Sequence, residues 1–152
     1  MFEDISAESA ATLAQGYFNG GYHCAEAVVA ACLESIGDGS VEAIAHATAF
    51  GGGFGRTFFE TCGVISGCLI VIGHFYGRRQ PGGSWDVPAT LGAKVMELFS
   101  EKHETRNCQV LRDRFGEEAQ MAECGKLVYQ GVYDLITFLQ SEECAQLVRA
   151  YD

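Results

Sequence analysis

Proline is scarce in this sequence of 152 residues and occurs only at positions 81 and 88. Because proline interrupts helices, its scarcity leaves room for long helical segments. No stretch alternates apolar and polar residues over a sustained length, as a half-buried strand would. The segments that fit helices are 6–18, 23–36, 40–50, 58–76, 86–103, 108–115, 118–139 and 142–150. We therefore predict an all-α, single-domain helical bundle over residues 1–152, with a central apolar, glycine-containing helix over 58–76.

Several helix ends carry recognisable signals. Ser40 and Asp86 are candidate N-caps, and either Thr105 or Asn107 can cap the segment 108–115. Within 118–139 we expect a break around Gly131, since glycine is a weak helix former. Gly63 and Gly67 are four residues apart and share one helix face. That face predicts close packing of another helix, from the same chain or across a homodimer.

Basic residues are few, ten against twenty acidic residues, which gives a net charge of −10. Such a chain repels phosphate, which argues against nucleic acid and anionic membrane surfaces as partners. The longest apolar run, 61–75, contains three glycines and His74 and is too short to cross a bilayer comfortably. The acidic N-terminus lacks the layout of a signal peptide. We therefore expect a cytoplasmic protein without membrane insertion.

Paired cysteines of the CxxC type are absent, although the chain has seven cysteines. In a reducing compartment, cysteines serve more often as ligands or redox groups than as static disulfides. Four of them lie at or near predicted helix starts: Cys24, Cys62, Cys108 and Cys124. The positive end of a helix favours the thiolate and suits a thiolate-ligated cluster. Their spacing matches no local metal motif, and each taken singly is more often a core residue.

The other three cysteines give a different signal. Cys32 lies deep in an alanine-rich helix and Cys68 in the most apolar stretch, so packing is the better interpretation for both. Cys144 is left undecided, because Glu142 and Glu143 should discourage its thiolate.

Two histidines and one glycine-rich run are weaker candidates. His23 neighbours Cys24 and is a surface residue, a fifth ligand or a proton carrier. His74 lies at the end of the central helix, where the helix dipole favours a charged imidazole. The run 51–57 lacks the lysine and the preceding strand of a phosphate-binding loop. We therefore interpret it as a connection between helices.

A family resemblance selects the same four cysteines. It is carried by GGGFGR at 51–56, TCGVISG at 61–67 and IGHFYG at 72–77, together with cysteines 24, 108 and 124. Over about residues 17–135 the chain resembles the C_GCAxxG_C_C family of redox-active proteins. The GCAxxG core corresponds to 61–67, with Thr61 in place of the first glycine and Gly63 in place of alanine. The resemblance implies redox chemistry and names no substrate.

A similar region occurs in split-Soret cytochrome c, which carries an iron–sulfur cluster besides its haems, and this implies iron–sulfur binding by analogy. Our leading hypothesis is a small redox protein in which Cys24, Cys62, Cys108 and Cys124 bind an iron–sulfur cluster. It would transfer electrons to a redox partner protein that the sequence does not identify, without catalysing a reaction by itself. Two alternatives stay open: a metal-free thiol–disulfide protein, and a structural protein whose cysteines bind zinc or only pack.

Overall fold

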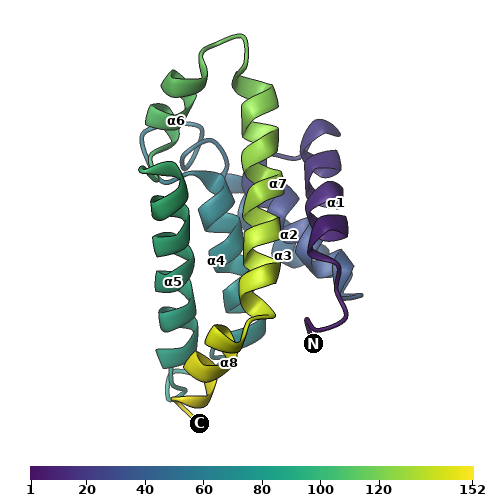
Figure 1. Ribbon diagram of the computed structural model, residues 1–152, viewed down its shortest axis with the longest axis vertical. Coiled ribbons are helices and arrows are strands. Elements are labelled where there is room, and N and C mark those ends of the chain that lie inside the picture. The colour runs from purple at the N-terminus through teal and green to yellow at the C-terminus, as the bar shows by residue number, and fades with distance from the viewer.

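The computed structural model describes residues 1–152 and is all-α, as predicted (Figure 1). It contains eight α-helices, one short 3-10 helix and no β-strand. The elements are α1 (Ala7–Asn19), α2 (Cys24–Ser35), α3 (Val41–Ala47), the 3-10 helix η1 (Thr48–Phe50), α4 (Gly63–Tyr76), α5 (Asp86–His103), α6 (Cys108–Phe115), α7 (Gln120–Leu139) and α8 (Glu142–Arg149). The only β-type pairing is an isolated antiparallel bridge between Thr61 and Asn107.

Helix α4 lies at the centre of the bundle and packs against α2, α5 and α7. Helix α1 covers α2 and α7, and α8 packs on α5 and α7. Figure 1 shows α6 and the loop before α4 at one end of the molecule, and α8 at the opposite end. The largest fully buried side chains come mainly from α2, α4 and α7, and include Leu33, Ile65, Ile72, Leu135 and Ile136. None of the helices has the length and apolar character needed to span a bilayer.

The two glycines on one face of α4 do admit a neighbouring helix, and that helix is α2 of the same chain. A Cβ atom added to Gly67 would lie 2.8 Å from the Ala25 carbonyl oxygen and 2.8 Å from Val28 Cβ. The close packing inferred from the sequence is therefore confirmed within the chain. These glycines need no homodimer to explain them, and the homodimer stays a prediction.

The central helix begins at Gly63, five residues later than the predicted start at Phe58. The φ angles of five consecutive residues, 52–56, lie between 59° and 65°, and φ of Phe58 is 65°. Left-handed backbone cannot continue a right-handed helix, and for Phe54, Arg56 and Phe58 it costs about 1–2 kcal/mol per residue. Apolar periodicity reports nothing about φ, so it extended the helix too far toward the N-terminus.

The predicted break at Gly131 is wrong, because α7 is continuous through it. A Cβ atom at position 131 would lie 2.2 Å from Val64 Cγ1. This glycine therefore serves close packing of α7 against α4. The predicted cap at Asp86 is also wrong: α5 begins at Asp86, with Trp85 in the N-cap position. Ser40 precedes α3 but its side chain makes no capping hydrogen bond.

Candidate functional site

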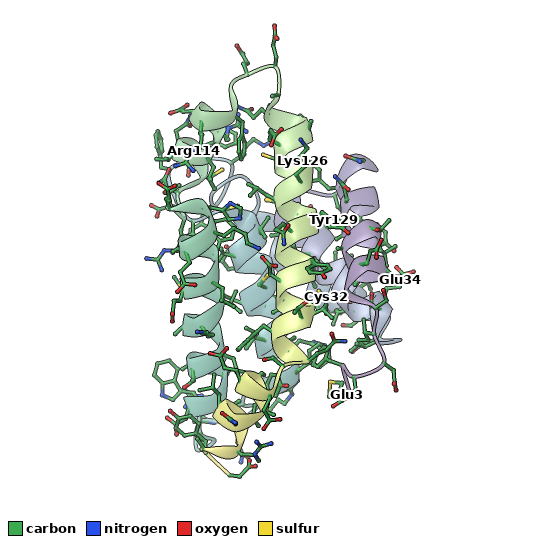
Figure 2. All side chains as sticks on the ribbon, in the orientation of Figure 1. Glu3, Cys32, Glu34, Arg114, Lys126 and Tyr129 are labelled. Atoms are coloured by element: carbon green, nitrogen blue, oxygen red, sulfur yellow. The ribbon has the colours of Figure 1, made fainter.

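Four cysteines line one cavity of about 640 Å³: Cys24, Cys62, Cys108 and Cys124. These are the four that the sequence analysis selected. The cavity lies at the end of the bundle that carries α6, the end marked in Figure 2 by Arg114 and Lys126. The remaining wall combines apolar, glycine and basic residues, among them Phe58, Met121, Leu127, Gly51, Gly52, Arg56 and Arg112. No three His, Cys, Asp or Glu side chains lie close enough to share a single metal ion.

Helix starts deliver these cysteines to the cavity. Cys24 is the first residue of α2, Cys62 is the N-cap of α4, and Cys108 is the first residue of α6. Cys124 lies in the second turn of α7. The first N–H groups of a helix have no partner within it and form a positive end. One of them, the Val64 N–H, acts to lower the pKa of the Cys62 thiol.

The Thr61–Asn107 bridge brings two of the cysteines together. The Cys62 N–H donates to the Arg106 carbonyl at 2.7 Å, and the Cys108 N–H donates to the Glu60 carbonyl at 2.9 Å. These two hydrogen bonds fix the register between the starts of α4 and α6. Residues 46 positions apart in the sequence thereby become neighbours.

The Asn107 side chain forms two hydrogen bonds at this junction between α4 and α6. Its Oδ1 accepts a hydrogen bond from the Val110 N–H at 3.0 Å, which caps α6. Its Nδ2 donates to the Phe59 carbonyl at 2.7 Å. Of the two caps considered from the sequence, Asn107 is the one that α6 uses, while Thr105 Oγ1 accepts from the Asn107 N–H.

Replacing Asn107 with alanine should lower the free energy of unfolding by about 1–2 kcal/mol, because a cap and a side-chain hydrogen bond are lost together. Asn107→Asp retains the capping oxygen and loses only the donation to Phe59, so it should cost less than the alanine variant. Urea unfolding of the three proteins measures both differences. Equal stability of the alanine variant and the wild type would show that the junction does not depend on this side chain.

Glycines make room for the sulfurs. A Cβ atom on Gly63 would lie 2.2 Å from Cys24 Sγ, and one on Gly53 would lie 2.6 Å from Cys108 Cβ. At Gly53 the added atom would also lie 2.9 Å from Phe58 Cα, so this site excludes a side chain, and at Gly63 a side chain would displace the Cys24 sulfur. The glycine-rich run 51–57 connects η1 to the start of α4 and forms one wall of the cavity.

The pKa values of Cys62, Cys108 and Cys124 move in the direction opposite to the sequence-based expectation. Burial raises the pKa of Cys62, and the neighbouring thiols, Cys24 first, raise it further. Burial also raises the pKa of Cys108, and that of Cys124 to about 11. The Arg112 charge lowers both of these pKa values without overcoming burial. Desolvation therefore has a larger effect on these thiol pKa values than the helix N-termini have. A positively charged group inside the cavity would lower the thiol pKa values.

The other three cysteines belong to the core. Cys32, Cys68 and Cys144 are 0%, 3% and 2% exposed and pack in the main hydrophobic cluster. Burial raises the pKa of Cys32 to about 12. Burial also raises the pKa of Cys144, and Glu143 adds to this in the direction inferred from the sequence. The packing interpretation is confirmed for Cys32 and Cys68, and Cys144 joins them.

Sequence reasoning missed two basic residues in the cavity wall, Arg56 and Arg112. Arg112 follows Cys108 by four residues, so helical spacing already places both on one face of α6. Arg56 lies in the loop before α4, where its φ angle is 59°. No helical spacing relates it to a cavity cysteine. Of the two histidines considered, His23 lines the cavity. His74 instead lies with its Nε2 2.8 Å from Asp38 Oδ2 and takes no part in the site.

Comparison with known protein families gives one match. The model of the family described as "Putative redox-active protein (C_GCAxxG_C_C)" matches residues 22–150. The chain belongs to this family. The matched range contains all four cavity cysteines and reaches beyond the resemblance seen from the sequence, which ended at about residue 135. Membership in the C_GCAxxG_C_C family supports a redox role. No curated protein and no solved structure matches the chain.

Proposed function

We propose that this protein transfers electrons through an iron–sulfur cluster bound by Cys24, Cys62, Cys108 and Cys124. The proposal rests on one observation. Four thiols, each at or near the start of a different helix, line a single cavity. The proposal is consistent with the redox role of the family.

The donor set suits such a cluster. Iron–sulfur clusters are held by cysteine thiolates, most often four of them. A single zinc ion with bonds of about 2.3 Å would require its sulfurs to converge on one point. Here the four thiols line one cavity of about 640 Å³, and no three of them are placed to hold a single ion. A cluster offers a separate iron atom to each cysteine, so its four ligands need not meet at one point.

The surrounding residues supply what an anionic cluster needs. The positive ends of α2, α4 and α6, together with the Arg112 charge, would compensate negative charge. Phe58, Val64 and Leu127 form apolar parts of the wall and limit the access of water, which helps to set a reduction potential. Cys62 is only 6% exposed, whereas the other three cysteines are partly exposed. When bound, the cluster would supply one-electron transfer close to the protein surface.

Anaerobic purification followed by reconstitution with iron and sulfide tests the proposal. We expect a brown protein with visible charge-transfer absorption and comparable amounts of iron and acid-labile sulfide. A colourless protein that contains zinc would contradict the proposal and favour a structural site. A colourless, metal-free protein that loses two thiols on mild oxidation would also contradict it, and would support a thiol–disulfide function.

A further inference from the structure

Two arginines in the cavity wall have no acidic partner. Arg56 and Arg112 both line the cavity, and neither forms an ion pair. The three lysines and Arg149 pair with carboxylates, whereas Arg78, Arg79, Arg106 and Arg114 form no ion pair either. What distinguishes Arg56 and Arg112 is that they line a cavity whose wall contains no Asp or Glu. Two cations thus face the same cavity without a counter-charge from the protein.

Arg112 is also held in place with an unused hydrogen-bond donor. The centre of its guanidinium lies 3.8 Å from the centroid of the Phe58 ring, in a cation–π contact that restricts its position. Its Nε is the one buried side-chain nitrogen or oxygen of the protein that has no hydrogen-bond partner. Buried donors are almost always satisfied, so an unsatisfied one calls for an explanation. The hydrogen-bond donors of this guanidinium are thus not used within the protein, and its terminal nitrogens are free for a ligand that accepts a hydrogen bond.

The cavity has the size and the mixed lining of a small-molecule site. Such sites typically measure about 300–1,000 Å³ and combine apolar walls with a few convergent polar groups. Here His23 and Thr48 join the two arginines as polar groups, while Phe18, Phe58 and Leu127 supply apolar wall. The guanidinium fork matches the paired oxygens of carboxylates and of tetrahedral oxyanions.

We propose that Arg112 and Arg56 form a binding subsite for a small oxyanion, beside the four cysteines and within the same cavity. The ligand class is a carboxylate or a tetrahedral oxyanion of the size of sulfate. This subsite deepens the proposed redox function, because it places a small molecule next to the cysteines. The role of the subsite rests on the proposed redox function. Binding of the anion itself needs no cluster.

Calorimetric titration with sodium sulfate and with sodium acetate, at constant ionic strength, tests the subsite. Both the metal-free and the reconstituted protein are titrated, and iron is measured in each sample. We expect saturable binding of at least one anion, and the preferred one identifies the ligand as tetrahedral or planar. Absence of binding of both anions in both forms would overturn the proposal. The iron content decides the cluster proposal independently of this result.

Three arginine variants assign the binding to the cavity. Arg112→Gln should weaken the preferred anion at least tenfold, and Arg56→Gln should weaken it as well. The matched control is Arg114→Gln, which removes the same charge from the same helix; the Arg114 side chain is exposed and donates to the His103 carbonyl. Unchanged affinity in Arg112→Gln, or an equal loss in Arg114→Gln, would overturn the proposal. Circular dichroism confirms that each variant is folded.

Discussion

Leucine in place of Gly67 should destabilise the protein by about 3 kcal/mol or more, because it overpacks the contact between α4 and α2. A Cβ atom at this position already falls 2.8 Å from the Ala25 carbonyl oxygen, which is backbone and cannot rotate away. The two helices would have to separate, and both belong to the buried core. Urea unfolding followed by circular dichroism measures the loss.

Gly73 on the same helix provides the control. No atom lies within 4 Å of a Cβ added there, so Gly73→Ala should be neutral or stabilise α4 by up to about 1 kcal/mol. A difference between the two variants assigns the effect to packing and excludes a general intolerance of α4 to side chains. Wild-type stability of Gly67→Leu would show that α2 and α4 do not pack as described.

Removing any one of the four cavity cysteines should abolish most of the iron and sulfide taken up on anaerobic reconstitution. The variants are Cys24→Ala, Cys62→Ala, Cys108→Ala and Cys124→Ala. A cluster held by four ligands loses an anchor in each case, and the vacant position admits water and oxidants. Iron and sulfide analysis, together with the visible absorption spectrum, measures the loss.

The structure offers a matched control for two of these variants. Cys32 lies on α2 with Cys24, and Cys68 lies on α4 with Cys62, yet neither lines the cavity. Figure 2 shows Cys32 about midway along the molecule, away from the end marked by Arg114 and Lys126. Cys32→Ala and Cys68→Ala should therefore lower stability through lost packing while they keep iron and sulfide. Equal metal content in the cavity and core variants would contradict the proposed ligand set.

Local signals explain how much of the fold could be predicted from the sequence. The bounds of α6 were predicted correctly because Asn107 caps it and Gly116 ends it within eight residues. The start of α4 was predicted incorrectly. Phe58 and Phe59 fit the apolar pattern of a helix, but the backbone at Phe58 is left-handed. Local signals predict a break at Gly131, because its packing partner, Val64, lies on another helix and leaves no trace in the local sequence.

For the candidate site, too, local signals predicted some features, while other features depend on tertiary structure. Helix-start positions and the family motif selected the four cysteines, and both signals are local. The cavity itself depends on tertiary structure, namely the Thr61–Asn107 bridge and the contact of Gly63 with Cys24. The direction of the thiol pKa shifts also depends on burial, which no short segment encodes. For this reason the sequence predicted which cysteines line one cavity and misjudged how readily Cys62, Cys108 and Cys124 ionise.

The origin of the four thiols has a consequence for how the protein matures. Cys24 and Cys124 are a hundred residues apart in the sequence, and no single half of the chain contains three of the four. In a nascent chain the proposed ligand set would therefore be incomplete until residue 124 has left the ribosome and the tertiary fold has formed. A metal centre that binds all four thiols would link distant segments of the chain and would stabilise the native state relative to the unfolded chain. If the four cysteines bind a cluster as proposed, cluster assembly and the final gain in stability would be a single, late event.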